Sequence, residues 1–203
     1  MKQCTFFAWA TVMGSLLLAA PGSSAPLSLV CIGDWGGESD QIPSNAAQKA
    51  ASAGMAKVSD EIDAQGVLLL GDNFYSRGVE TNTSKRFQET FEEVYPVEAF
   101  KSLPFFVIAG NHDHAGNVQA QIDYHGSPRW HFPELYYTLP FQFTSSSGVA
   151  RTVDLIMIDT VDLCSLCEEE YVGCPLLGAA EDDAQWLWLE NELEASTADF
   201  LWV

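Results

Sequence analysis

The stretch VLLLGDNFY, residues 67–75, decides the fold: four apolar residues are followed by a glycine and then by an acidic residue. A short apolar run bounded by glycine is typical of a buried strand. The glycine lets the backbone turn sharply, so Asp72 should stand at the carboxyl end of that strand. The same pattern recurs at 27–34 and at 105–111, which end in an aspartate and an asparagine.

The three residues that follow these strands are evenly spaced. Asp34 and Asp72 are 38 residues apart, and Asn111 follows after another 39. Each interval can hold one helix and one strand, so the pattern predicts βαβ units and a parallel sheet. Because the carboxyl ends of parallel strands share one edge of a sheet, we expect these three side chains to converge.

Two helices are expected between the strands. The first should be capped by Ser44 or Asn45 and end at Gly66 in a left-handed conformation. Its apolar residues recur at helical spacing and should face the core: Ala51, Met55, Val58 and Ile62. The second helix should begin at Thr83 or Ser84 and bury Phe87, Phe91 and Val94.

The second half of the chain carries consecutive strands. We expect them at 136–139, 141–143 and 151–159, around a turn at 145–148. A helix capped by Asp182 or Asp183 should follow, with an apolar surface around Trp186 and Trp188. The last apolar run, 200–203, begins a strand without closing it. The expected fold is therefore α/β, a mixed β-sandwich flanked by helices and interrupted at its C-terminus.

The first 25 residues combine one lysine, an apolar run and small residues, which is the pattern of a signal peptide. Residues 26–203 should then form the N-terminal portion of one domain in a secreted, lysosomal or lumenal protein. Removing Lys2 leaves eight basic against 28 acidic residues, a formal charge of −20. Such a field repels nucleic acid, and the apolar run is short for a membrane span.

Cysteines and a sequon agree with a secretory route. Cys31, Cys164, Cys167 and Cys174 would remain after cleavage, and their even number permits disulfides without specifying the pairs. Asn82 begins an Asn-Thr-Ser glycosylation sequon in a polar stretch. The sequence leaves the oligomeric state open.

The donors after the strands are hard ligands, which suit hard cations, and one carboxylate can bridge two metal ions. Tyr75 narrows the choice, because a phenol becomes a ligand near neutral pH only beside a strong Lewis acid such as ferric iron. An isolated tyrosine in such a loop is more often a packed aromatic residue than a metal ligand. The three glycine-containing motifs, which follow one another along the chain at Asp34, Asp72 and Asn111, favour the metal ligand for Tyr75.

The motifs resemble those of the tartrate-resistant purple acid phosphatases, a branch of the calcineurin-like metallophosphoesterase superfamily. The resemblance covers most of residues 26–203 and includes KRFQETF at 85–91, GNV at 116–118 and DTV at 159–161. It implies phosphate monoesters or phosphoproteins as substrates. It also implies a dinuclear centre of Fe(III) with a divalent ion, Fe or Zn.

The resemblance also implies roles for individual residues. Asp34 and Tyr75 would bind the ferric ion, Asp72 would bridge both metals, and Asn111 would bind the divalent ion. His112 would protonate the leaving alcohol. Asp113 would hydrogen-bond a metal ligand or His112 and fix its orientation, with a strand-end cap as the alternative, and His114 would contact the substrate or have a structural role.

Two histidine elements of the family pattern, Gly-His and Gly-His-x-His, do not occur in the 203 residues. The expected activity is therefore conditional on three further ligands. Two alternatives stay open: a metallophosphodiesterase or nucleotidase with the same site, and a catalytically inactive secreted binding fragment.

Overall fold

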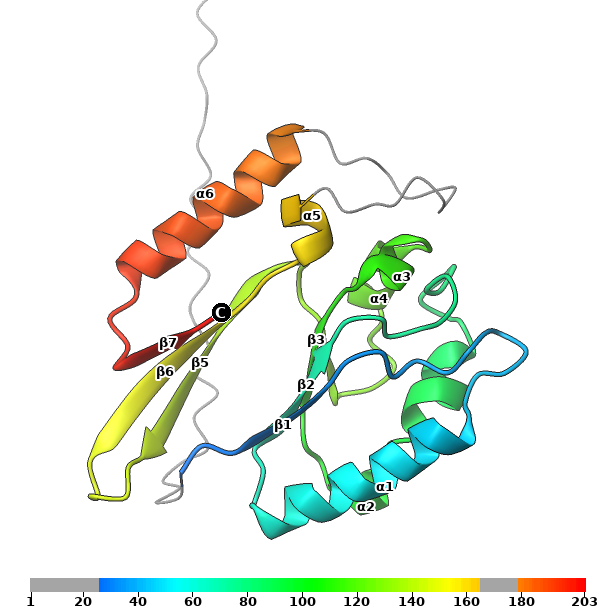
Figure 1. Cartoon of the computed structure of the whole chain (residues 1–203), viewed down its shortest axis with the longest axis horizontal. Coiled ribbons are helices and arrows are strands. Elements are labelled where there is room, and N and C mark those ends of the chain that lie inside the picture. Colours follow the sequence, from blue (N-terminus) through cyan, green and yellow to red (C-terminus); the bar gives the residue numbers. More distant parts are fainter. Residues whose placement is uncertain (1–25, 165–178) are drawn as a thin grey trace, which may run out of the picture.

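The computed structural model describes residues 26–164 and 179–203, and it contains two sheets (Figure 1). The first sheet is parallel and has the order β1-β2-β3-β4. Its strands are β1 (Leu29–Ile32), β2 (Gly66–Leu70), β3 (Phe105–Ile108) and β4 (Trp130–His131). The predicted strands at 27–32, 67–70 and 105–109 are thus confirmed.

The register of this sheet aligns the carboxyl ends of its first three strands. Ile32 lies opposite Leu69, and Leu70 lies opposite Ile108. The loops that carry Asp34, Asp72 and Asn111 consequently leave the sheet at the same edge. The prediction that Gly66 ends the first helix in a left-handed conformation is wrong, because Gly66 is the first residue of β2. The left-handed residue after that helix is Asp63, with φ of 49°.

The second sheet is mixed, with the order β5-β6-β7. Its strands are β5 (Tyr137–Thr144), β6 (Ala150–Met157) and β7 (Phe200–Trp202). β5 and β6 form an antiparallel hairpin, whereas β7 pairs with β6 in parallel. The two strands expected at 136–139 and 141–143 are one strand, because β5 lies at the sheet edge, where Pro140 is tolerated.

Helices cover the two sheets on their outer sides (Figure 1). α1 and α2 lie beside the first sheet, and α6 lies along the second. The helices are α1 (Ala46–Glu61), the π-helix η1 (Phe87–Glu92), α2 (Val97–Phe100), α3 (Asn111–His114), α4 (Val118–Ile122), α5 (Thr160–Cys164) and α6 (Ala179–Ala195). α6 therefore begins before Asp182 and Asp183. Within the described ranges, no helix is long and apolar enough to cross a membrane.

One continuous core joins both sheets. Aromatic residues from the loops and η1 fill its centre, and Phe106 of β3 meets Phe141 of β5 edge to face, with centroids 5.7 Å apart. Phe87, Phe91 and Val94 are buried, as their spacing predicts, although the segment is a π-helix. On α6, Gln185 and Leu189 face the core, while Trp186 is half exposed.

α1 contradicts most of its apolar pattern, although Met55 is partly buried and packs against the core as predicted. Asn45 caps it as predicted, but Val58 and Ile62 are exposed, whereas the buried positions are Gln48, Ser52 and Ser59. The reason is polar packing: Gln48 donates to the carbonyl of Thr90 at 3.1 Å, and Ser52 donates to that of Val94 at 2.5 Å. A carbonyl within η1 and another just after it thus select the face that α1 buries.

This inversion predicts unequal effects of two substitutions on α1. Ser52→Ala removes the donor to Val94 and should lower the free energy of unfolding by about 1 to 2 kcal/mol. Val58→Ala trims an exposed side chain and should change it by less than about 0.5 kcal/mol. Urea unfolding of both variants measures the difference, and a larger loss for Val58→Ala would contradict the assigned face.

Candidate metal centre

The loops after β1 and β2 place two carboxylates side by side. Asp34 and Asp72 both have left-handed backbones, with φ of 55° and 51°. Aspartate is one of the few residues other than glycine that tolerates this conformation. The amide of Asp34 donates to the carbonyl of Gly71 at 3.2 Å, which joins the two loops at their start.

The phenol of Tyr75 lies between these carboxylates. Its oxygen is 2.6 Å from Oδ1 of Asp34 and 2.8 Å from Oδ2 of Asp72. Burial raises the pKa of Tyr75 far above its usual range. The hydrogen bonds to the two aspartates and the charges of their carboxylates raise it further. Oxygen atoms of three side chains therefore converge, and the two carboxylates favour the protonated form of the phenol.

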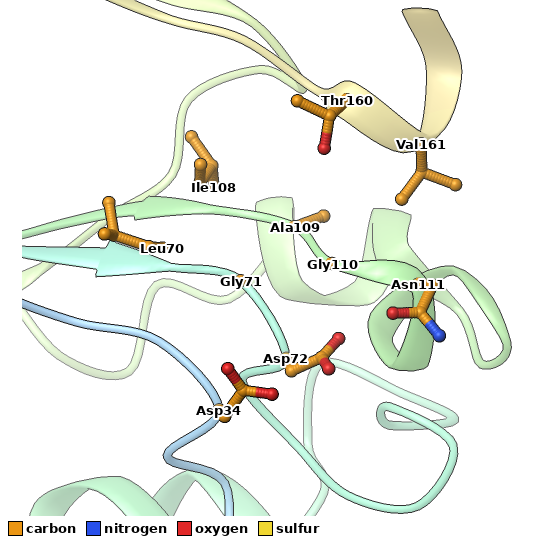
Figure 2. Close-up of a pocket in the computed structure, with 10 residues that line it drawn as sticks. All are labelled: Asp34, Leu70, Gly71, Asp72, Ile108, Ala109, Gly110, Asn111, Thr160 and Val161. Atoms are coloured by element: carbon orange, nitrogen blue, oxygen red, sulfur yellow. The ribbon is translucent and has the colours of Figure 1, made fainter. Parts of the chain in front are cut away.

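Asn111 faces the same cavity from the loop after β3. The cavity has a volume of about 440 Å³ and is lined by Asp34, Leu70, Gly71, Asp72, Ile108, Ala109, Gly110, Asn111, Thr160 and Val161. Figure 2 shows Asp72 between Asp34 and Asn111, which is where a bridging carboxylate would have to lie. The structure thus brings together all four residues that the sequence selects as metal ligands.

These donors fit a hard metal ion in their chemistry, since carboxylate, phenol and amide oxygens are its preferred ligands. Among residues 26–164 and 179–203, no three His, Cys, Asp or Glu side chains form a metal-binding group. The candidate centre is consistent with this, because only two of its four members are carboxylates.

His112 lies at the edge of this cluster. Its backbone amide donates to Oδ1 of Asp72 at 3.1 Å, and its ring packs against that of Tyr75 at an angle of 50°, with centroids 4.3 Å apart. Nδ1 is 2.7 Å from the carbonyl of Ser76, which can only accept, so Nδ1 carries a proton. Nε2 lies 4.0 Å from Oδ2 of Asp72.

Asp113 is completely buried and holds the loops together. Its carboxylate accepts from the amides of Gly110 at 2.9 Å and Asn73 at 3.0 Å, and from the side chain of Gln121 at 2.8 Å. Burial raises the pKa of Asp113 to about 6, against the opposing effect of these donors. Asp113 thus links the backbones beside Asp72 and Asn111.

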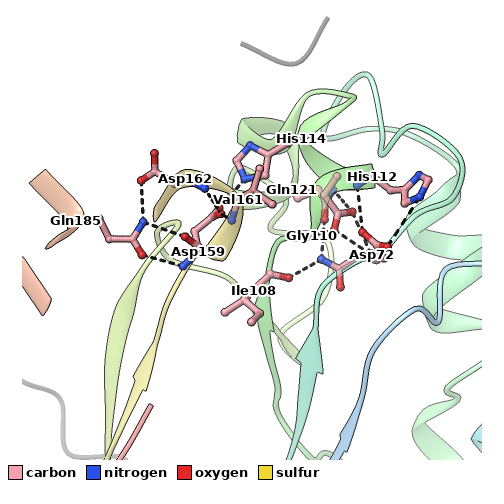
Figure 3. A network of polar contacts seen from close by, with 12 residues as sticks. Asp72, Ile108, Gly110, His112, His114, Gln121, Asp159, Val161, Asp162 and Gln185 are labelled. Atoms are coloured by element: carbon pink, nitrogen blue, oxygen red, sulfur yellow. Dashed lines mark hydrogen bonds and ion pairs between the residues drawn. The ribbon is translucent and has the colours of Figure 1, made fainter. Parts of the chain in front are cut away.

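His114 is buried away from the cavity and belongs to a second polar network (Figure 3). Its Nε2 is 2.6 Å from Oδ2 of Asp159, whose Oδ1 accepts from the amides of Val161 and Asp162. Gln185 of α6 accepts from the amide of Asp159 at 2.9 Å. This network connects α3, which carries Asn111, to the opposite cavity wall.

The sequence did not predict that His114, Asp159 and Gln185 form one hydrogen-bonded network. Asp159 stood out only as part of a family flank, and nothing in the sequence marks Gln185 on its helix. Burial lowers the pKa of His114, but the bond to Asp159 and the charges of Asp159, Asp113 and Asp162 outweigh it, so the pKa is raised above its ordinary value of 6.5.

The remaining sequence candidates lie outside the cluster. Asn82 is exposed, and its side chain donates to the carbonyl of Asp123 at 3.2 Å, so the sequon is on the surface. Cys31 is an exposed free thiol. The side chains of Cys164, Cys167 and Cys174 lie outside the described part, as do residues 1–25.

Two packed sheets, with oxygen donors at the carboxyl edge of the parallel one, define an α/β protein whose site is built on strand-end loops. The chain belongs to the calcineurin-like phosphoesterase family, whose model matches residues 27–199. Members of this family generally bind two metal ions.

The sequence is similar to mammalian proteins named tartrate-resistant acid phosphatase type 5. The rabbit protein, from Oryctolagus cuniculus, is 43% identical over 193 residues, covering 93% of this chain and 58% of its own length. The Rattus norvegicus protein is 37% identical over 206 residues, covering 96% and 62%. The resemblance inferred from the motifs is confirmed, and the chain spans about 60% of the length of these relatives.

A solved structure agrees on the fold alone. GAP50, described as the anchor in the inner membrane complex of Plasmodium, superposes with a TM-score of 0.66 at 24% identity, covering 86% of this chain and 53% of that one. The predicted α/β metallophosphoesterase fold is thus confirmed.

The His114–Asp159 pair predicts a pH dependence of stability. A histidine whose pKa is raised on folding contributes stability that is complete below about pH 6.5 and is lost as the pH rises through the folded pKa. The urea midpoint should therefore contain a component that falls above about pH 6.5.

His114→Asn should remove that component, in addition to lowering stability at all pH values. His125→Asn serves as the control, because His125 is exposed. Urea titrations from acid to mildly alkaline pH measure both, and the same slope in His114→Asn as in the unmodified chain would contradict the assignment.

Proposed function

We propose that this chain carries part of a dinuclear metal centre that contains iron and hydrolyses phosphate monoesters, as in an acid phosphatase. The convergence of Tyr75 with Asp34 and Asp72 carries the proposal, because a phenol within 2.8 Å of two carboxylates is a ready set of ferric ligands. The similarity to tartrate-resistant acid phosphatases supports it.

Four residues would hold the metals. Asp34 and Tyr75 would bind Fe(III), Asp72 would bridge, and Asn111 would bind a divalent ion, Fe or Zn. Bound metals would supply Lewis-acid stabilisation of the phosphoryl oxygens and activation of water. Asp113, through the Gly110 and Asn73 amides, would fix the loops that carry Asn111 and Asp72.

His112 would act as the general acid. The Ser76 carbonyl orients the ring through Nδ1, so the proton available to a leaving alcohol is the one on Nε2. That atom lies 4.0 Å from Oδ2 of Asp72, the proposed bridging ligand. His114 is proposed as a positioning residue through its bond to Asp159.

The substrate class and the cellular route are part of the same proposal. Small phosphate monoesters or phosphoproteins would be hydrolysed in a secreted or lysosomal compartment, after removal of residues 1–25 and glycosylation at Asn82. Comparing monoesters with diesters under the same metal loading distinguishes a monoesterase from a diesterase or nucleotidase. A stable chain that binds no metal would instead favour the binding-fragment alternative.

The ferric site predicts a visible absorption band. After loading with ferric iron and zinc, the oxidised chain should show tyrosinate-to-iron charge transfer, and Tyr75→Phe should abolish it. Tyr124→Phe is the control, since Tyr124 stacks on Phe87 with centroids 3.7 Å apart, away from the cluster. A band that persists in Tyr75→Phe would refute the assignment.

The acid role of His112 predicts a dependence on the leaving group. His112→Asn should slow hydrolysis of an alkyl phosphate by about 10² to 10⁴-fold, because an alkoxide leaves poorly without a proton. Hydrolysis of p-nitrophenyl phosphate should fall much less, since nitrophenolate needs no proton. Equal losses for both substrates, at unchanged metal content, would argue against proton donation by His112.

A further inference from the structure

Arg86 is a buried cation that takes no part in the chemistry described above. Only 3% of the residue is exposed, and its guanidinium lies over the ring of Phe74, 5.7 Å from the centroid. Its nitrogens donate to four oxygens: Nη2 to Gly36 at 2.6 Å, Nη1 to Tyr75 at 2.7 Å and to Asp40 at 2.9 Å, and Nε to Thr90 at 2.8 Å.

Two of these oxygens belong to different ligand loops. The Gly36 carbonyl follows Asp34 by two residues, and the other carbonyl is that of Tyr75 itself. The same Gly36 oxygen also accepts from the amide of Tyr75 at 3.1 Å. The guanidinium therefore holds together the backbones that carry Asp34 and Tyr75.

The two loops touch directly at this point. A Cβ on Gly36 would stand 2.2 Å from the carbonyl oxygen of Asn73, so no side chain fits between them. Trp35 adds a hydrogen bond of 3.0 Å from its indole nitrogen to the side chain of Asn73. Arg86 adds a charged contact where the two loops meet, because it donates to the Gly36 carbonyl of one loop and to the Tyr75 carbonyl of the other.

Arginine is suited to this place by its shape. Its planar guanidinium offers five N–H donors in a fixed arrangement, whereas lysine offers a compact ammonium on a flexible stem. Asp40 and Thr90 accept from two further donors and so fix the plane of the group. A lysine could reach one carbonyl but could not hold both in the same geometry.

We propose that Arg86 is a positioning residue of the metal centre, which sets the separation between the Asp34 carboxylate and the Tyr75 phenol. It would act through the backbone and would not touch metal or substrate. This inference rests on the proposed ferric site, in which small displacements of ligands change affinity strongly.

Arg129 provides a matched control. It is also 3% exposed, lies over the Phe91 ring at 5.0 Å, and donates to the Tyr95 carbonyl and to Glu92. It contacts neither ligand loop in the described structure. Both substitutions keep a buried charge and replace a guanidinium that lies over an aromatic ring. Arg86 donates four hydrogen bonds and Arg129 donates two, and only Arg86→Lys disturbs the contact between the two ligand loops.

Two measurements on the full chain test the proposal. The first is ferric binding: Arg86→Lys should weaken affinity by about 10- to 100-fold and shift the tyrosinate band, whereas Arg129→Lys should leave both unchanged. The second needs no metal. Amide hydrogen exchange at Tyr75, whose N–H is bonded to Gly36, should accelerate in Arg86→Lys but not in Arg129→Lys.

The outcomes separate the two proposals. If the unmodified chain binds no iron, the proposed function fails, and exchange at Tyr75 still decides the role of Arg86. If Arg86→Lys matches Arg129→Lys in every measurement, the positioning role is overturned.

Should Arg86→Lys fail to fold, Thr90→Val provides a milder variant. It keeps shape and charge but removes the hydroxyl, which accepts from Nε of Arg86 and donates to the carbonyl of Pro43. It should move affinity and exchange in the same direction by a smaller amount. No change in either measurement would overturn the proposal.

Discussion

The parallel register of β1, β2 and β3 is the constraint on which the rest of the structure depends. It delivers three loops to one edge of a sheet, and every candidate ligand lies on these loops. The positive φ angles of Asp34 and Asp72 then turn both carboxylates toward each other, so that one phenol reaches both. A shift of one residue between β1 and β2 would reverse the faces of a strand and separate the donors.

Buried polar side chains hold the loops at this edge of the sheet together, and each joins a different pair of elements. Asp113 joins the loops after β2 and β3, and Arg86 joins those after β1 and β2. His114 and Asp159 connect the parallel sheet to the second sheet, so that the two walls of the cavity are tied across the core. All of these side chains are buried, where an unsatisfied polar group is costly and the geometry of a satisfied one is well defined.

The sequence predicted those features that arise from local patterns. Apolar runs ending in glycine located β1, β2 and β3, and the residue after each glycine identified Asp34, Asp72 and Asn111, whereas the two-residue strand β4 was not predicted. The predictions failed where hydrogen bonds between distant parts of the sequence override the local pattern. The Thr90 and Val94 carbonyls select the buried face of α1, and Gln185 joins the polar network only because the fold brings it within hydrogen-bond distance of Asp159. Whether each gathered side chain binds metal is a chemical question that position alone does not answer.

The wide spacing of the donors also has a consequence for how the molecule is made. Residues 34, 72 and 111 meet only after two crossovers have closed, so their cluster consists of contacts between parts of the chain that are distant in sequence. Topologies of this kind fold slowly, because loop closure precedes the contacts that compensate for it. The cluster can therefore exist only in the completed sheet, and any ion that binds there would shift the folding equilibrium toward the native state by mass action.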